Sequence, residues 1–406
     1  MTLSYDGATA SGYYVVPKGS EDAKALAAEA TAYKDAVQNV PELSFLFCTI
    51  DLGTDPKNSN DVVFYVEDLP FPFGDDPQLA EVSEPGGSII PAAMNGYAAV
   101  VGTDYPSKAT PQHSGGAFRW TLKGGLAFLG SLPGGTFNDF PSSTAIGISD
   151  NSAVVVGTSG LTTTDGTLTQ HAFRWTAALG MTDLGSLNGA DGQSQATATD
   201  AAGDVVIGQS NGVSFRWNLT EPHTGKGKMV ALGTLGGTAT ATAISADGKT
   251  IVGAATVGGE THLVEWKKDQ KIPRDLGTMT GENFFSPTAV SANGAVIVGT
   301  ALNGNTRNFY VPPSGPNIAA NSVAFRWTQA TGMQNLNTLM KEAGVSLHDN
   351  TLLTATTISP DGAFIGGTQV KKGAPTETLT GASLVRYMDG AVMTAKAASR
   401  LMQKYQ

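Results

Sequence analysis

Short runs of alternating apolar and polar residues, separated by glycine-containing turns, fill most of the chain. In AFRWT, Phe and Trp lie two positions apart with Arg between them, so both rings should face one side of a β-strand and Arg the other. In TAISADGKTIVG, two such runs flank Asp-Gly, a dipeptide that accommodates the positive φ angles of a tight hairpin turn. The pattern predicts β-hairpins along the whole sequence.

Two phrases recur along the chain. The first has the form AFRWT…GMTDLGSL, and its clear copies contain Trp120, Trp175, Trp217, Trp266 and Trp327. The second has the form A-x-A-I-S-x-D-G-x-x-V-V-G, and its clear copies end at Gly157, Gly208, Gly253, Gly299 and Gly367. The first four Trp-to-Gly distances are 37, 33, 36 and 33 residues (157 − 120, 208 − 175, 253 − 217, 299 − 266). A period of this size indicates stacked units, and two hairpins per unit give the four strands of a propeller blade.

Weaker copies extend the repeat to both ends of the chain. A degenerate first phrase around Val66 precedes a second phrase that ends at Gly102, and the first phrase at 385–387 has no second phrase after it. The missing half stands at the start, where Leu3 to Gly12 has the S-x-D-G layout. Seven phrases of each kind result. We therefore expect an all-β, seven-bladed β-propeller over residues 1–406, closed by pairing of the N- and C-terminal strands, because closure removes open strand edges.

Two segments depart from the repeat and predict helices. One lies at about 20–40, within an insertion at 17–43, where Ser20 can cap the helix and Pro41 ends it. The other is a C-terminal helical tail at 391–406. Both helices could pack on the ring, or either could dock into a larger assembly.

Composition narrows the possible partners and surroundings. With 50 glycines and 15% charged residues among 406, the chain suits a turn-rich all-β protein. A net charge of −10 argues against nucleic acid as a partner, since a basic surface supplies most of that affinity. No apolar run is long enough to span a membrane, and the first residues lack the pattern of a signal peptide. Cys48 is the single cysteine, so the redox compartment stays open.

The copies of FRW, DLG and S-x-D-G, as in AFRWT…GMTDLGSLNG and ATAISADGKTIVG, closely resemble the HAF repeat. This repeat is found in predicted extracellular bacterial proteins and in passenger regions of some autotransporters. The resemblance covers residues 79–370 well and the two ends weakly. It implies a surface-exposed repeat protein and supplies no catalytic residues to transfer. The chain departs from the family in showing neither a secretion signal nor an outer-membrane barrel.

The polar residues of the repeat are expected to be structural. SADGKT is close to the Asp-box of sialidase propellers, but Asp-Gly is itself a turn former, which favours a turn role for Asp6, Asp247 and Asp361. The Arg of FRW recurs at one repeat position, so it should pair within or between blades, at Arg119, Arg174, Arg216, Arg326 and Arg386. The five histidines fall in different contexts, without metal-ligand spacing, and no nucleophile elbow, P-loop or Rossmann fingerprint is found. We expect no catalytic site, no metal and no cofactor.

Strand alternation divides the connections between two ends of the ring. The turn inside each first phrase and the Asp-Gly turn share the turn end. The links between phrases and the loops leading to the next FRW strand share the link end, where loop length varies most and aromatics outside the repeat gather. Candidate binding residues there are Phe137, Asn138, Asp139, Phe140, Phe284, Phe285, Asn308, Phe309 and Tyr310. These aromatics could instead be buried between blades.

The sequence therefore favours a non-enzymatic, extracellular β-propeller for adhesion, receptor recognition or assembly, on a virion as a tail or capsid component or on a bacterial surface. Its expected partner is a protein or carbohydrate surface, including other virion or cell-surface subunits. One alternative is a secreted autotransporter-type adhesin passenger. The other is a glycan-active enzyme on a propeller scaffold, for which acidic residues should converge on the ring axis.

Overall fold

The fold is almost entirely β-strand. The computed structural model describes residues 2–3, 9–15, 45–54, 62–68, 88–94, 99–105, 115–121, 124–135, 142–163, 165–302, 309–310, 318–319, 322–342, 347, 350–362, 364–371, 381–388 and 391–392. Within these ranges one α-helix is found, α3 (Leu336–Glu342). The predicted all-β class is confirmed.

The described strands form seven four-stranded antiparallel sheets and one two-stranded sheet. The first sheet contains β1 (Thr2–Leu3), β2 (Thr9–Val15), β3 (Phe45–Thr54) and β4 (Val62–Asp68). The second contains β5 (Ser88–Met94), β6 (Val100–Tyr105), β7 (Gly116–Thr121) and β8 (Gly125–Phe128). The third contains β9 (Ser143–Ile148), β10 (Val154–Thr162), β11 (Leu168–Thr176) and β12 (Gly180–Asp183).

The remaining sheets follow the same order. The fourth contains β13 (Ser194–Thr199), β14 (Val205–Ser210), β15 (Val213–Glu221) and β16 (Lys226–Ala231), and the fifth contains β17 (Ala239–Ile244), β18 (Thr250–Val257), β19 (Glu260–Lys267) and β20 (Arg274–Gly277). The sixth contains β21 (Phe284–Val290), β22 (Val296–Leu302), β25 (Val323–Thr328) and β26 (Gly332–Asn335). The last contains β27 (Asn350–Ile358), β28 (Phe364–Lys371), β29 (Gly381–Met388) and β30 (Ala391–Val392). Between β22 and β25, β23 (Phe309–Tyr310) and β24 (Ile318–Ala319) form the two-stranded sheet.

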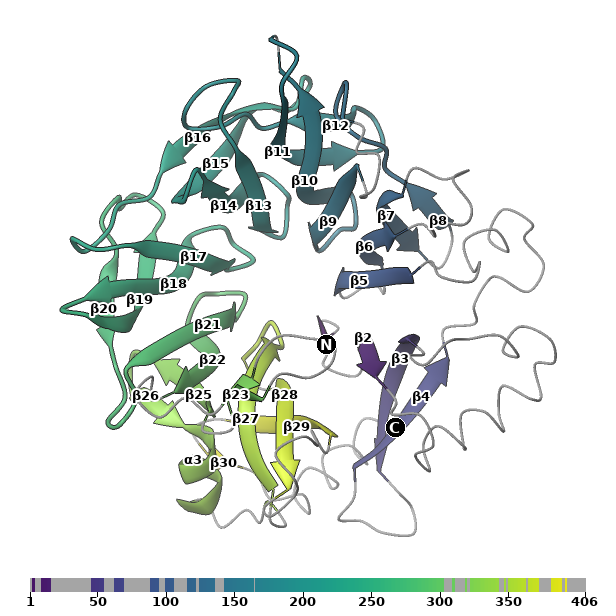
Figure 1. Ribbon diagram of the computed structural model, residues 1–406. Helices are drawn as coiled ribbons and strands as arrows, with labels where there is room; N and C mark the ends of the chain where they lie inside the picture. Colours follow the sequence, from purple (N-terminus) through teal and green to yellow (C-terminus); the bar gives the residue numbers. More distant parts are fainter. Residues whose placement is uncertain are drawn as a thin grey trace.

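The four-stranded sheets stand around a common centre, with strands such as β9, β13 and β17 innermost and strands such as β8, β16 and β20 on the outside (Figure 1). The innermost strands of neighbouring sheets are in contact from β5 through β9, β13, β17 and β21 to β27. This is the arrangement of a β-propeller.

The boundary between units differs from the one expected. A sheet joins the second phrase to the first phrase that follows it: β9 and β10 come from the phrase ending at Gly157, and β11 and β12 from the next AFRWT…MTD. The last sheet is therefore complete at β30, and in the described strands β1 pairs with β2 alone. The prediction that the N- and C-terminal strands share a sheet is wrong for these strands. A periodic sequence fixes the repeat length but not the point at which one sheet ends.

Two further expectations change at the ends of the chain. Val66 lies in β4, the outermost strand of its sheet, and not in the third strand that carries FRW elsewhere. Ala391 and Val392 pair with Met388 and Tyr387 as strand β30, so the tail predicted as a helix from 391 begins as a strand. The rest of that tail and the predicted helix at 20–40 lie outside the described residues.

A buried serine fixes the turn of the second phrase at Ser149, Ser245 and Ser291, and Asp200 takes its place in the fourth sheet. The Ser245 hydroxyl donates to Asp247 Oδ1 at 2.7 Å and accepts the backbone N–H of Thr250 at 2.9 Å, and Ser245 is fully buried. Gly248 completes the turn at φ +66°, where a Cβ would also approach Asp200 Oδ2 of the preceding sheet to 2.9 Å. The same serine bonds recur at Ser149 and Ser291. The predicted turn role of Asp247 is confirmed.

The turns of successive sheets are joined by backbone hydrogen bonds. The N–H of Asp150 donates to Ala201 O at 3.1 Å, and the N–H of Ala201 donates to Ala246 O at 3.0 Å. The N–H of Asp247 then donates to Ala292 O at 3.3 Å, and the N–H of Ala292 donates to Pro360 O at 2.8 Å. This turn belt links five consecutive sheets without using any side chain.

A β-bulge on the innermost strand explains the glycine that closes each second phrase. Ala241 pairs with Gly253 and Ala243 with Val252, so Thr242 is the extra residue, and its hydroxyl donates to Val252 O at 3.4 Å. A Cβ on Gly253 would collide with the carbonyl oxygen of Thr240 and lie 2.9 Å from Cζ3 of the Trp266 ring. The bulge brings the two backbones together and the ring of the third strand covers the gap. Threonines occupy the equivalent bulge position at Thr197, Thr288 and Thr356.

The core lies between neighbouring sheets. Phe215 and Trp217 of β15 share a cluster with Val154 and Val156 of β10 in the preceding sheet. Both rings therefore face the same interface, as the alternation in FRW predicts. The intervening Arg216 points away from them and is itself buried.

We expect Gly253→Ala to lower the free energy of unfolding by about 3 kcal/mol, because the new methyl group must displace backbone and a buried ring. Gly258→Ala is the matched control. That residue has φ +60° and nothing within 4 Å of a built Cβ, so only backbone strain of about 1 kcal/mol opposes it. Denaturant unfolding of both variants measures the difference, and equal losses would contradict the role of close strand approach.

Candidate functional site

The predicted binding residues separate into three groups. Phe284 and Phe285 begin β21, and Phe309 and Tyr310 form β23. The other members lie outside the described residues: Phe137, Asn138, Asp139, Phe140 and Asn308.

Phe285 is a core residue, so its assignment to a binding surface is wrong. Only 1% of it is exposed, and its ring meets the edge of Phe325 at a centroid distance of 5.7 Å and an interplanar angle of 70°. Alignment of FSPTAVS with SQATATD puts Phe285 at the position of Ser194, the buried first residue of an innermost strand. That alignment is the sequence signal that could have found it. Phe284 aligns with the exposed Gln193 and is itself 37% exposed.

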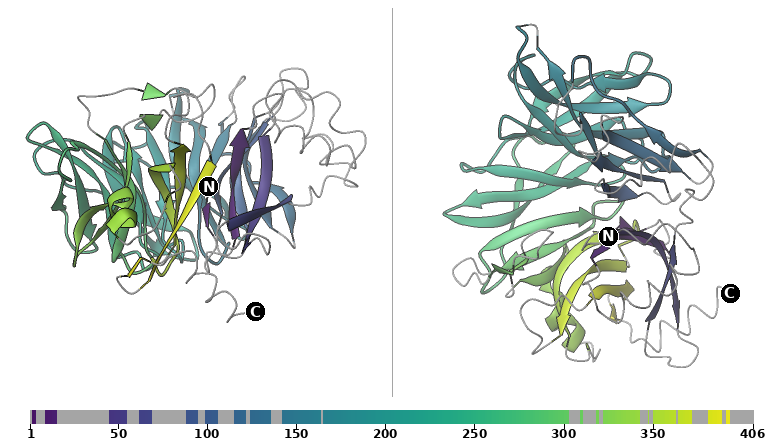
Figure 2. Two further views of the ribbon diagram at one scale, coloured as in Figure 1. Left: turned by 90° about the horizontal axis from the view of Figure 1, so that it is seen from below. Right: turned by 45° about the vertical axis from the view of Figure 1, so that its right-hand side comes forward.

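The strand pair β23–β24 is an addition to the repeat. Phe309 pairs with Ala319 and Tyr310 with Ile318, in the connection from the second to the third strand of the sixth sheet. Elsewhere this connection is as short as Asn211-Gly212, between β14 and β15. Figure 2 shows the two short green arrows apart from the layer of four-stranded sheets. The insertion therefore places backbone and aromatic residues beyond the scaffold at the link end.

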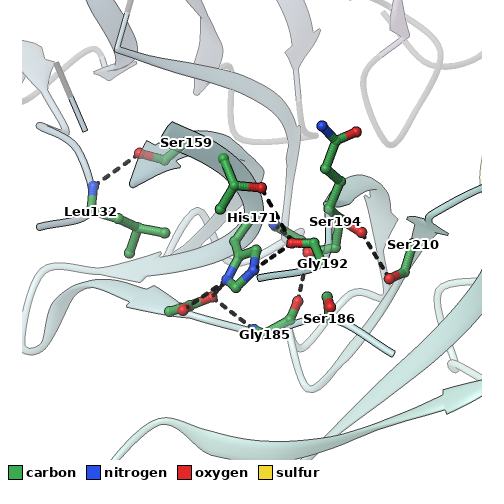
Figure 3. A network of polar contacts seen from close by, with 12 residues as sticks. Leu132, Ser159, His171, Gly185, Ser186, Gly192, Ser194 and Ser210 are labelled. Carbon is green, nitrogen blue, oxygen red and sulfur yellow. Dashed lines mark hydrogen bonds and ion pairs between the residues drawn. The ribbon is translucent and has the colours of Figure 1, made fainter. Parts of the chain in front are cut away.

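A buried histidine at the link end was not singled out by the sequence. His171 is 1% exposed; its Nδ1 lies 2.8 Å from Asp183 Oδ1, and its Nε2 lies 2.9 Å from Gly192 O (Figure 3). Asp183 Oδ1 also accepts the N–H of Gly185 at 2.7 Å. These contacts tie the link 184–193, which joins the third sheet to the fourth, to β11 and β12.

The same pair recurs in the fifth sheet. His262 Nδ1 lies 2.9 Å from Asp275 Oδ2, and Asp275 Oδ1 accepts the N–H of Gly277 at 2.8 Å. The signal is the histidine two residues before the Phe position of FRW, together with the Asp of DLG. The expectation that the histidines fall in different contexts is wrong for these two. The copies differ in that no partner is found for His262 Nε2 in the described part of the chain, and its side chain is 18% exposed.

The geometry around His171 is that of a structural tie and not of a catalytic triad. A general base must offer a free nitrogen to a nucleophile, and Nε2 of His171 is directed at the carbonyl of Gly192. Ser194 is equally occupied, since its hydroxyl donates to Gly185 O at 2.5 Å and accepts the N–H of Ala172 at 2.9 Å.

This serine clasp recurs at the sheet interfaces in two orientations. Ser194 belongs to the innermost strand β13 and reaches the third strand of the preceding sheet. At the next interface the hydroxyl comes from the opposite side: Ser214 of β15 donates to Ala239 O at 3.1 Å and accepts the N–H of Ala241 at 2.9 Å. One interface further on, Leu263 and Phe285 take these two positions and pack together in one apolar cluster. At each of these three interfaces, therefore, either one of the two facing residues carries a hydroxyl or neither does.

Two arginines of FRW, Arg174 and Arg216, bind partners between and within sheets, as predicted. Arg174 Nε donates to Gly203 O of the next sheet at 2.7 Å, and Arg216 Nε donates to Asn218 Oδ1 of its own strand at 2.8 Å. In the fifth sheet Glu265 replaces Arg. Its buried carboxylate forms ion pairs of 2.7 Å with Arg274 and 2.9 Å with Lys267. Charged side chains of either sign at this position therefore have polar partners nearby.

Neither a metal-binding cluster nor a membrane-spanning helix is found in the described ranges. No group of three or more His, Cys, Asp or Glu side chains there is placed to hold a metal ion. No helix in those ranges is long and apolar enough to cross a bilayer.

Comparison with known proteins gives weak structural likenesses. No family model matches the chain, so the HAF-repeat family is not confirmed, and no curated protein matches. Among solved structures, an oligogalacturonate lyase in complex with manganese is similar at a TM-score of 0.49 and 11% identity, over 85% of this chain and 83% of that one. The β-propeller domain of the Trilobed protease from Pyrococcus furiosus is similar at 0.43 and 9%, over 76% and 84%.

TolB from Acinetobacter baumannii is similar at a TM-score of 0.40 and 13% identity, over 80% of this chain. The chain spans 62% of that protein's length. Likenesses of this strength carry no argument about function. The propeller assignment rests on the strand order and the arrangement of sheets in this chain.

We expect Phe285→Ala to destabilise the fold by about 3–5 kcal/mol, because it empties a buried ring site. Phe284→Ala, the adjacent exposed residue, should change the free energy of unfolding by less than about 1 kcal/mol. Thermal and denaturant unfolding measure both, and a large loss for Phe284→Ala would remove it from the candidate surface.

The serine clasp predicts a rescue across the interface. Ser214→Ala should cost about 1–3 kcal/mol, because the buried N–H of Ala241 loses its partner. Adding Ala239→Ser should recover part of that loss through a different bond, since its hydroxyl would accept the N–H of residue 214 as Ser194 accepts the N–H of Ala172. A double-mutant cycle measures the coupling, and strictly additive losses would contradict the exchange.

Proposed function

We propose that this chain is a non-enzymatic, surface-exposed β-propeller whose link end serves adhesion, receptor recognition or assembly, on a virion as a tail or capsid component or on a bacterial surface. The observation that carries the proposal is the β23–β24 pair, an insertion that contains Phe309 and Tyr310 and adds nothing to the four-stranded sheets. Added loops on a rigid scaffold are where binding usually resides. The class of partner is a protein or carbohydrate surface, because the sequence has the aromatics Phe309 and Tyr310 directly after Asn308.

We further infer that the scaffold is a closed seven-bladed ring. Contacts of β1 with both β5 and β27 support this, because a closed ring requires the first sheet to meet the second on one side and the last on the other. Closure would then come from packing of two whole sheets side by side. A ring closed in this way holds the loops of its link end in fixed relative positions.

Binding is favoured over catalysis because polar side chains of the repeat are already hydrogen-bonded within the scaffold. His171, Ser194 and Arg174 each complete hydrogen bonds within the scaffold. A glycan-active enzyme would need acidic groups at positions outside the repeat. Conversion of any oligosaccharide by the purified chain would therefore contradict the proposal.

The decisive experiment removes the insertion. Residues 303–321 are replaced by Asn-Gly, the turn that connects β14 and β15, and binding is measured to bacterial cells, to isolated particles and to a glycan array. We expect the unfolding temperature to stay within a few degrees and binding to fall at least about tenfold, the loss of one well-buried contact cluster. A second variant, Phe309→Ala with Tyr310→Ala, isolates the aromatics. Unchanged binding in both variants, with the fold retained, would contradict a recognition role for this end.

A further inference from the structure

His171 makes two hydrogen bonds that a neutral imidazole cannot make together. The Asp183 carboxylate and the Gly192 carbonyl are both acceptors, so each ring nitrogen must carry a proton, and the ring must be an imidazolium. Neutral histidine has one N–H. On deprotonation, one of the two contacts therefore becomes an unfavourable approach of two lone pairs.

The Asp183 carboxylate determines which of the two hydrogen bonds of His171 is lost on deprotonation. A charge-assisted bond to Asp183 is stronger than a bond to a neutral carbonyl, so the remaining proton stays on Nδ1. The contact given up is the one between Nε2 and Gly192 O. Gly192 is buried near the end of the link 184–193, two residues before Ser194 of β13.

We propose that His171 is a pH-dependent fastener: doubly protonated, it holds the link 184–193 against β11. On losing its Nε2 proton it gives up its bond to Gly192 O, which keeps the longer contact with Thr169 Oγ1 at 3.4 Å, and the link loosens. The inference goes beyond the proposed binding function and does not depend on any ligand. It gives one connection at the link end two states that are selected by pH.

The surroundings of the imidazole are consistent with this behaviour. The charged side chain that faces it is Asp183 of β12; β10 presents Ser159 opposite it, and the link presents the carbonyls of Ala190 and Gly192, with Asp191 exposed to solvent. Burial alone would lower the pKa of His171, but the hydrogen bond and charge of Asp183, with the two carbonyls, outweigh it and raise the pKa above its ordinary 6.5.

The sign of the pH effect follows from that direction. Because the folded-state pKa lies above the unfolded value, the stabilisation is complete below about pH 6.5 and is lost as the pH rises through the folded-state pKa. At alkaline pH the bond from His171 to Gly192 in the link 184–193 is therefore lost, and at acidic pH it forms.

The test is amide hydrogen exchange of the full chain between pH 6 and pH 9, with rates corrected for intrinsic pH dependence. We expect protection of amides in 184–193 to fall roughly tenfold across this range, the loss of about one hydrogen bond. In His171→Gln, protection should be low at both pH values. His262→Gln is the matched control, because its Nε2 holds no carbonyl in the described part of the chain, and it should keep the wild-type response of 184–193.

A second variant keeps the proposal testable if His171→Gln folds poorly. Asp183→Asn retains an acceptor for Gly185 N–H but removes the charge, so the pH at which 184–193 loses protection should move down. NMR of the ring nitrogens should show both of them protonated at pH 6. Protection that is independent of pH in the wild type, or an unshifted midpoint in Asp183→Asn, would overturn the proposal. Neither result bears on ligand binding, so failure of the fastener and failure of the recognition role are separate outcomes.

Discussion

The backbone hydrogen bonds between successive Asp-Gly turns constrain the rest of the structure. They run from the turn at Asp150 to the turn at Pro360 and set the approach of one sheet to the next. The shape of each turn is fixed by a buried serine, or by Asp200 in the fourth sheet, and glycines at 203, 248, 294 and 362 leave room for the preceding sheet. The repeated Ser and Gly of the second phrase are therefore requirements of packing between sheets as much as of the turn itself.

The glycine that closes the second phrase answers a related constraint within each sheet. A bulge on the innermost strand brings it so close to its neighbour that a Cβ at Gly253 has no space. The extra residue is a threonine in four of the sheets, and its hydroxyl satisfies a carbonyl beside the bulge. Bulging and increased twist of this kind suit strands that converge on a centre. The hydroxyls at these bulges are thus hydrogen-bonded within the scaffold.

Two features of the link end differ between sheets. The β23–β24 pair is an addition to one sheet, and only in the third sheet of the described chain does the histidine of a His–Asp pair also contact a carbonyl, that of Gly192. We propose the first as a binding surface and the second as a pH-dependent connection. Buried serines beneath the link 184–193, such as Ser194, bind it to the scaffold on the side away from solvent.

The sequence by itself determined the hairpins, the four-stranded unit and the structural role of Asp247 and Arg174, because strand alternation and Asp-Gly turns are set by residues close together in the chain. Only the tertiary structure decided which hairpins share a sheet, since a periodic chain can be divided after either phrase. It also decided that Phe285 is buried while Phe284 is exposed, because the second residue of β21, and not the first, faces the neighbouring sheet. The contact of His171 with Gly192 depends on the path of a connection between sheets, and no local pattern encodes that path.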